Sequence, residues 1–281
     1  MEIVAQYGIY KRLLELAENL SELIDAKSNG KSEVEISTVE FVTPLSILPL
    51  AAYGNQYGVS INCTEDPNSD ACGYLRAIGF QSGVKNFQRG DQGYLPIMNR
   101  PVAREDNLLT EYEAGIFLRA ELPDAFGLRN SLDVLTAELV ANVRQHARIA
   151  HYWILAQYYE RSNNLCEIVV ADNGRGYKKS FEGTEFEAET DAEAIQNAFE
   201  GKSSKPRKND LIPRGFGIRH IANTFLNSDF KGKLIIISGK SIQYYKQNEN
   251  KEIPLPLGWP GSVVCINFNA KDLDAMDYLV D

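Results

Sequence analysis

The spacing of apolar side chains predicts that the chain begins with a one-sided helix. Between residues 3 and 26, apolar residues recur every three or four positions, with acids and lysines between them. These apolar positions are Ile9, Leu13, Leu16, Leu20 and Leu23. The segment "KSNG" that follows is a helix stop signal. The apolar stripe of this helix can pack on its own domain or against a second copy in a homodimer, and both uses stay open.

Short strand and helix patterns alternate over the next seventy residues. The run "EVEISTVEFV" favours a strand, "PLSILPLAAYGNQYG" a helix that begins at Pro44 and ends near Gly54, "VSINC" a strand and "NSDACGYLRAIGF" a helix. This alternation predicts a small α/β layer with parallel strands. The segment "QRGDQGYLPIMNRPV" is rich in Gly and Pro and shows no periodicity. We therefore expect a first domain over residues 1–100 and a second over 101–281.

The second half of the chain predicts helices followed by antiparallel strands. We expect helices over residues 105–121, from Asn130 or Ser131 to about Ala147, and over "DAEAIQNAFEG" and "GFGIRHIANTFL". The strand-type runs are "HYWILAQYY", "CEIVVAD", "KLIIISG", "SIQYYK" and "GSVVCINF". This order indicates an α+β sandwich rather than a doubly wound parallel sheet.

Composition and charge narrow the function classes. The 281 residues carry a formal net charge of -9, which argues against a general electrostatic grip on nucleic acid. The N-terminal segment carries Glu2 and Lys11 and lacks the uninterrupted apolar run of a signal peptide or membrane span, so we expect a cytoplasmic protein that does not insert into membranes. The four cysteines form no CxxC pair, so we expect buried free thiols rather than zinc ligands or disulfides.

Three motifs carry candidate chemistry. In "AELVANVRQHA" the residues Glu138, Asn142 and His146 are spaced four apart and line one stripe of a helix, either as a solvated polar face or as a functional one. The strand-type run "CEIVVAD" ends in an acid and leads into "DNGRG", and "RGFGIRH" holds a second glycine pair. Glycines permit positive φ and close backbone approach, which suits either a turn or a nucleotide.

Taken in order, "ELVANVRQH", "DNGRG", "RGFGI" and "PGSVVCINF" resemble the four sequence boxes of the GHKL ATPases over roughly residues 105 to 270. The first box is most similar to the anti-sigma serine kinase branch. The three histidines, His146, His151 and His220, include no acceptor on an upstream helix, and no large transducer follows the last strand, so we expect neither a histidine kinase nor a topoisomerase relative. The resemblance implies a C-terminal Bergerat-fold α/β sandwich that binds ATP and Mg²⁺.

The resemblance assigns the adenine side of the site to the second and fourth boxes. Asp172 would accept a hydrogen bond from the adenine amino group, and this carboxylate would disfavour guanine, which presents a carbonyl oxygen there. Gly174 and Gly176 would let the chain pass close under the base and ribose. Ser262 stands where the family usually has Thr after Gly, and it keeps the hydroxyl.

The resemblance assigns the phosphate side to the first and third boxes. Asn142 would offer an amide oxygen to Mg²⁺, and Glu138 would act as general base for attack on the γ-phosphate. Gly215 and Gly217 would expose backbone N–H groups to the triphosphate at the start of a helix. The stretch from Lys178 to Arg214 would form an ATP lid whose bases either reach the phosphates or stay solvated. The remaining residues assigned to the nucleotide site are His146, Lys202 and Ile218.

The first hundred residues resemble a STAS domain, the fold of anti-sigma-factor antagonists. The resemblance rests on "VEFVTPLSILPLAAYGNQYGVSINC" and "CGYLRAIGF". Leu45 stands where a phosphoacceptor would be, and Thr43 and Ser46 are better suited to capping a turn or a helix. We therefore expect a docking or sensing domain.

Two functions from different classes follow. The first is a Mg-dependent ATPase or Ser/Thr protein kinase that acts on a protein partner, with a STAS-like regulator as one candidate. The second is an ATP-controlled interaction module with little or no turnover, in which the nucleotide orders the lid and changes the surface offered to a partner.

Overall fold

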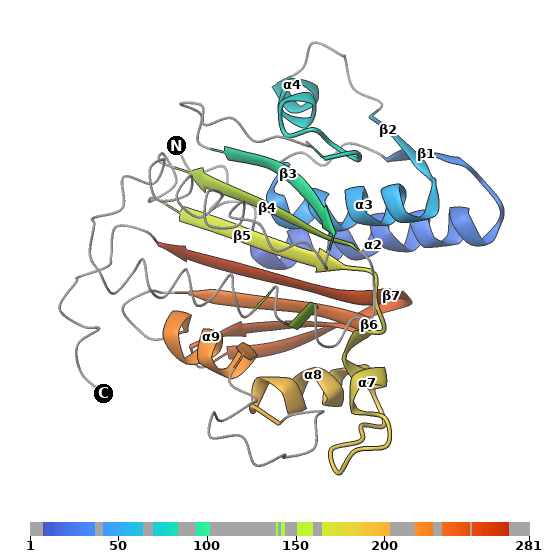
Figure 1. The fold of residues 1–281 in the computed structure, drawn as a ribbon. Coiled ribbons are helices and arrows are strands. Elements are labelled where there is room, and N and C mark those ends of the chain that lie inside the picture. The colour runs from blue at the N-terminus through green and yellow to red at the C-terminus, as the bar shows by residue number, and fades with distance from the viewer. Residues whose placement is uncertain are drawn as a thin grey trace.

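The computed structural model of the chain has a mixed α/β fold in which helices cover both faces of an antiparallel sheet (Figure 1). The structure describes residues 8–36, 42–63, 70–83, 94–101, 139, 142–143, 151–159, 165–202, 217–226, 232–247 and 249–269. In chain order the elements are α2 (Ile9–Ser28), β1 (Glu33–Ile36), α3 (Pro44–Tyr57), β2 (Ser60–Cys63), α4 (Asp70–Ala77), β3 (Tyr94–Pro101), β4 (His151–Tyr159), β5 (Leu165–Asp172), α7 (Gly176–Phe181), α8 (Asp191–Phe199), α9 (Gly217–Phe225), β6 (Lys233–Lys246) and β7 (Glu249–Asn269).

The main sheet has five strands in the order β3-β4-β5-β7-β6, and every neighbouring pair is antiparallel. Strands β1 and β2 form a separate parallel pair. The predicted antiparallel strands of the second half and the predicted parallel pair of the first half are both confirmed. Strands β6 and β7 form a long hairpin whose register shifts on either side of Gly239.

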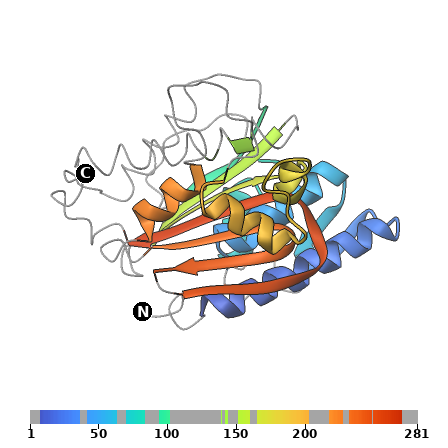
Figure 2. The same ribbon diagram turned by 90° about the horizontal axis from the view of Figure 1, so that it is seen from below.

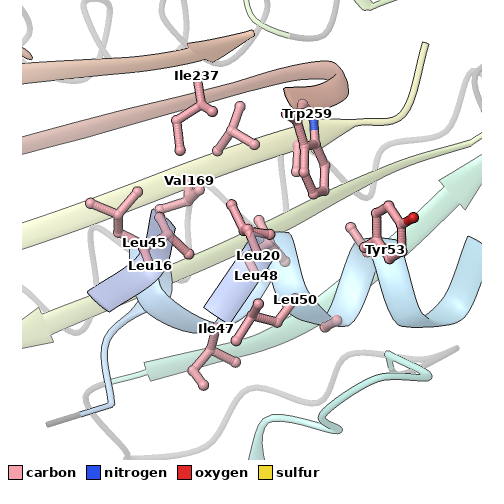
Figure 3. Close-up of a cluster of buried hydrophobic side chains, with 14 of the residues drawn as sticks. Leu16, Leu20, Leu45, Ile47, Leu48, Leu50, Tyr53, Val169, Ile237 and Trp259 are labelled. Atoms are coloured by element: carbon pink, nitrogen blue, oxygen red, sulfur yellow. The ribbon is translucent and has the colours of Figure 1, made fainter. Parts of the chain in front are cut away.

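Helices α2 and α3 pack together on one face of the main sheet. The apolar stripe of α2 is buried from Leu13 to Leu23, with Leu13, Leu20 and Leu23 each 0% exposed, and Ile9 at its start is partly buried. Figure 3 shows Leu16 and Leu20 of α2 meeting the side chains of α3 and the sheet residues Val169 and Ile237. No helix in the described part of the chain is both long enough and apolar enough to cross a membrane.

Helices α7, α8 and α9 lie on the opposite face, in front of the strands in Figure 2. Alternation along β5 separates the two cores. Val169 and Ala171 face α2 and α3, whereas Ile168 and Val170 join the core that includes Ile218 of α9. Asp172, the polar residue that ends β5, therefore lies on the same face of the sheet as Val170.

The predicted domain boundary near residue 100 falls at the end of a strand of the main sheet. The Gly- and Pro-rich segment that the sequence indicated as a linker contains β3, which pairs with β4. A register shift between Leu95 and Met98 breaks the strand alternation, so Leu95, Ile97 and Met98 are all buried and no period of two is visible. Described residues on both sides of the predicted boundary share one hydrophobic core.

Helix α3 continues one turn beyond the predicted end at Gly54. Gly54 lies inside the helix, where a Cβ atom would approach the carbonyl oxygen of Val59 to 2.7 Å, so its role is close packing and not helix termination. The helix ends instead at Gly58, which has φ +65° in the left-handed region. At the other end, Thr43 and Ser46 form the capping box and Pro44 occupies the first helical position.

Candidate functional site

Three polar residues form a row across the ends of neighbouring strands in the main sheet. Asp172 of β5 pairs with Ser262 of β7, which in turn pairs with Ser238 of β6. Directly opposed residues share a face of a sheet. The row continues the face of Val170, Val264 and Ile236, which is the face that α9 covers. The acid that ends "CEIVVAD" is therefore placed on the same side of the sheet as the third predicted motif.

The carboxylate of Asp172 is buried, at 3% exposure, and is held by hydrogen bonds from Gly174 and Ser262. Its Oδ1 accepts the N–H of Gly174 at 2.8 Å, and its Oδ2 accepts a short hydrogen bond from the Ser262 hydroxyl. Two carboxylate oxygens offer about four acceptor positions, so acceptor capacity remains for an N–H of a ligand. Burial raises the pKa of Asp172, and the bonds from Ser262 and Gly174 oppose that shift.

The main chain of Asp172 is fixed from β7. The indole N–H of Trp259 donates to the Asp172 carbonyl oxygen at 2.9 Å. Gly261 lies so close that a Cβ atom on it would overlap this carbonyl oxygen and the nitrogen of Gly174. The segment "WPGS" thus supplies an anchor and a required glycine as well as the predicted Ser262. Trp259 and Gly261 were not among the predicted site residues.

The segment of residues 173–176 that follows β5, called the glycine loop below, is held in place by Ser238. Gly176 has φ +71°, and a Cβ atom there would lie 2.7 Å from the Ser238 hydroxyl and 3.1 Å from the Gly261 carbonyl oxygen. That hydroxyl accepts the N–H of Tyr177 at 3.1 Å and donates to the Gly261 carbonyl at 2.8 Å. Glycine is therefore required at position 176 both by conformation and by space. Gly174 contributes its N–H to Asp172 and has no positive φ.

The first and third motifs meet the same core. Residues 139 and 142 are helical, and Leu139 and Val143 are buried in the cluster that contains Ile218 at the start of α9. Asn142 is partly exposed beside them, and Gly217 is the first residue of α9. Glu138, His146 and Gly215 lie outside the described residues.

Lys202 is held within the segment that follows the glycine loop. Its Nζ atom lies 2.8 Å from Asn197 Oδ1 and 2.9 Å from Glu200 Oε2, and it sits 5.9 Å from the centre of the Phe186 ring. Hydrogen bonds from Gln196 and Lys202 lower the pKa of Glu200. The described contacts of Lys202 therefore lie with residues 186–200 and not with Asp172 or Ser262.

The first part of the predicted lid packs on β6. Phe199 of α8 stacks on Tyr245 with ring centres 4.0 Å apart, and Asp191 accepts the N–H of Lys240 at 2.9 Å. Residues 176–202 are thus docked on the sheet. Residues 203–214 of the predicted lid lie outside the described residues.

The α3 side of the sheet holds two further polar residues that the sequence interpretation missed. Glu167, at 0% exposure, accepts hydrogen bonds from the N–H of Leu45 at 2.9 Å and from Asn267 at 2.9 Å, and pairs with buried Arg12 at 3.3 Å. Asn173 donates its amide to the Ala52 carbonyl oxygen of α3 at 3.1 Å. Each stands at a buried position in or next to an apolar strand run, which was the available signal.

The polar groups at the start of α3 are already bonded by Thr43, Ser46 and Glu167. Thr43 is 0% exposed and Ser46 is 4% exposed, and both hydroxyls serve the capping box. The Glu167 carboxylate already fills the positive end of the helix next to them. The interpretation of Thr43 and Ser46 as capping residues is confirmed.

Comparisons of the chain with models of known protein families, with curated proteins and with solved structures give no match.

Proposed function

We propose that the chain binds ATP with Mg²⁺ at the row of Asp172, Ser262 and Ser238 and is a GHKL-type ATPase with a Bergerat fold. The observation that carries the proposal is the Asp172 carboxylate. It is buried at the end of β5, held by Ser262 and Gly174, and still able to accept a hydrogen bond. It lies on the face that Leu139, Val143 and α9 also cover.

Selection of adenine follows from the acceptor character of this carboxylate. The amino group of adenine would donate to the ionised Asp172, whereas guanine would bring a carbonyl oxygen against it. A hydrogen bond to a charged group contributes roughly 1.5 to 3 kcal/mol. The tight contacts of Gly176 and Gly261 keep the loop close to the strand ends, and this supports a flat ligand lying against the backbone.

The phosphate side is assigned to the first and third motifs. Asn142, whose side chain is partly exposed, would supply an amide oxygen to Mg²⁺, which would neutralise phosphate charge. Gly217 begins α9, and a helix start offers N–H groups to phosphates. Glu138 would orient the attacking water or hydroxyl, with Gly215, His146 and Ile218 lining the same site and Lys202 at the edge of the lid.

The region before residue 100 is proposed as a docking or sensing element for a protein partner. Thr43 and Ser46 are buried in a capping box, so phosphorylation in the manner of a STAS domain would require α3 to open. A separate STAS-like protein is the candidate partner of a kinase reaction.

Turnover distinguishes the two functions that remain. If the chain is a Ser/Thr kinase or ATPase, the full chain with Mg-ATP releases phosphate or labels a partner, and Glu138→Gln abolishes this while a fluorescent ATP analogue still binds. If the chain is an ATP-controlled interaction module, Glu138→Gln changes neither nucleotide binding nor partner binding. Failure of ATP, with GTP as control, to displace the fluorescent analogue from the wild type would overturn both.

A further inference from the structure

Helix α3 covers three buried polar atoms on the face of the sheet opposite Asp172. They are Oδ1 of Asn99, Nε1 of Trp153 and Oδ1 of Asn173, and none has a hydrogen-bond partner in the described part of the chain. Trp153 is 1% exposed and Asn173 is 6% exposed. Folded proteins pair nearly all such atoms with protein or ordered water. Three orphaned atoms in one region therefore point to a ligand.

The ladder of the sheet brings the three side chains together. Asn99 of β3 is opposite Trp153 of β4, and Trp153 is opposite Ala171 of β5, two residues before Asn173. Opposed residues in an antiparallel pair share a face and have Cα atoms about 5 Å apart. The side chains of Asn99, Trp153 and Asn173 thus rise from neighbouring positions on three adjacent strands.

Helix α3 closes the site from above. Asn99 donates its amide to the Asn55 Oδ1 atom at 3.2 Å, and Asn173 donates its amide to the Ala52 carbonyl oxygen at 3.1 Å. Residues 52 and 55 lie one helical turn apart, roughly 5 Å. Each orphaned oxygen belongs to a carboxamide whose nitrogen is bonded to α3, and Trp153 lies on the strand between those that carry the two carboxamides.

The chemistry of the three atoms selects the ligand. Two are acceptors and one is a donor, so the occupant must donate twice and accept once. A cation is disfavoured because the indole N–H would point its positive end at it. An anion is disfavoured because it would lie against two amide oxygens. Water is the smallest neutral molecule with the required groups, and it commonly bridges otherwise unsatisfied buried groups. We propose that one buried water molecule bridges Asn99, Trp153 and Asn173 under α3.

This water would complete the link between α3 and the candidate nucleotide site. Asn173 directly follows Asp172, and its amide nitrogen is already bound to α3. With its oxygen held by the water, the position of the glycine loop depends on residues of β3 and β4 that face away from Asp172. This consequence rests on the proposed function, whereas the water itself does not.

Proton NMR of the full chain tests the water directly, because the chain has two tryptophans, Trp153 and Trp259. The indole N–H of Trp259 is bonded to the Asp172 carbonyl oxygen and serves as an internal control. We expect a cross-relaxation peak between bound water and the indole proton of Trp153, and none for Trp259. Trp153→Phe and Trp259→Phe assign the two signals. Absence of the water peak at Trp153, or equal peaks at both indoles, would overturn the proposal.

Asn99→Ala tests the bridging set and its consequence. Loss of this acceptor should weaken the water peak at Trp153 and reduce the affinity for a non-hydrolysable ATP analogue about threefold to tenfold. Asn62→Ala is the matched control, because Asn62 is an exposed asparagine of the separate β1-β2 pair, and it should leave the water peak unchanged. An undiminished water peak in Asn99→Ala contradicts the proposed bridge. If the chain binds no nucleotide, the proposed function fails and the water peak still decides this inference.

Discussion

The Ser262 hydroxyl donates to Oδ2 of Asp172 across the ladder between β7 and β5. Together with the N–H of Gly174, this bond favours the ionised carboxylate, while burial favours the neutral acid and dominates, so the pKa of Asp172 is raised above its ordinary value of 3.8. A charged group kept in such a place at the cost of stability is typical of a functional site.

Asp172→Asn should therefore stabilise the protein at neutral pH. Because the pKa of Asp172 is raised on folding, its favourable contribution is fully present below pH 3.8 and is lost as the pH rises through the folded-state pKa. The variant cannot ionise, so its melting temperature should exceed that of the wild type at neutral pH, and the difference should shrink toward acid. Calorimetry across pH measures this. A variant that melts lower than the wild type at pH 7 would contradict the assignment.

Gly176→Ala should destabilise the chain and disrupt the loop. The left-handed φ of +71° costs a non-glycine residue about 1 kcal/mol, and the Cβ atom would meet Ser238 and Gly261. Forced packing of this kind adds typically about 1 to 3 kcal/mol. Gly183→Ala is the matched control, because Gly183 has the same φ of +71° with nothing within 4 Å. Urea unfolding should give a clearly larger loss for position 176, and equal losses would contradict the packing argument.

Ser238→Ala should cost about 1 to 3 kcal/mol of stability, because it leaves the N–H of Tyr177 and the carbonyl of Gly261 without the buried hydroxyl that joins them. It should also weaken nucleotide binding by loosening the glycine loop. Exposed Ser60 offers a control, and Ser60→Ala should leave both properties unchanged. Urea unfolding and nucleotide titration of both variants check this prediction, and a silent Ser238→Ala would remove Ser238 from the site.

Glu167→Gln should destabilise the chain by roughly 3 kcal/mol, since it leaves the buried Arg12 guanidinium without its counter-charge. The substitution also removes the negative charge that Glu167 places next to the positive N-terminal end of α3. Glu249→Gln breaks the exposed pair with Lys251 and should leave the melting temperature unchanged. Thermal unfolding of the two variants measures the contrast. Similar effects at both positions would show that the Arg12 pair does not hold α2 and α3 on the sheet.

Much of the fold could be predicted from periodicity. The stripe of α2 has the spacing of a one-sided helix, and β4 and β5 stand out as short apolar runs because both of their faces are covered. β3 could not be predicted because its bulge hides the alternation. The true end of α3 was missed because Gly54 serves packing inside the helix while Gly58 ends it.

The residues of the candidate site could be predicted where a short sequence motif contains them. The resemblance of their segments to the GHKL boxes named Asp172, Gly176 and Ser262, and the structure brings these three residues together. Ser238 and Trp259 could not be named, because their roles depend on which strand lies next to β5 and β7. Pairing of strands distant in sequence is set by tertiary packing and leaves no local pattern.

The role proposed for Asp172 is recognition of the adenine base of ATP. Isothermal titration of the full chain with a non-hydrolysable ATP analogue and Mg²⁺, beside GTP and the Asp172→Asn variant, tests it most directly. We predict micromolar affinity for the ATP analogue, little binding of GTP, and loss of both affinity and selectivity in the variant. Absence of binding by the wild type, or binding that Asp172→Asn leaves unchanged, would show that Asp172 does not recognise the base.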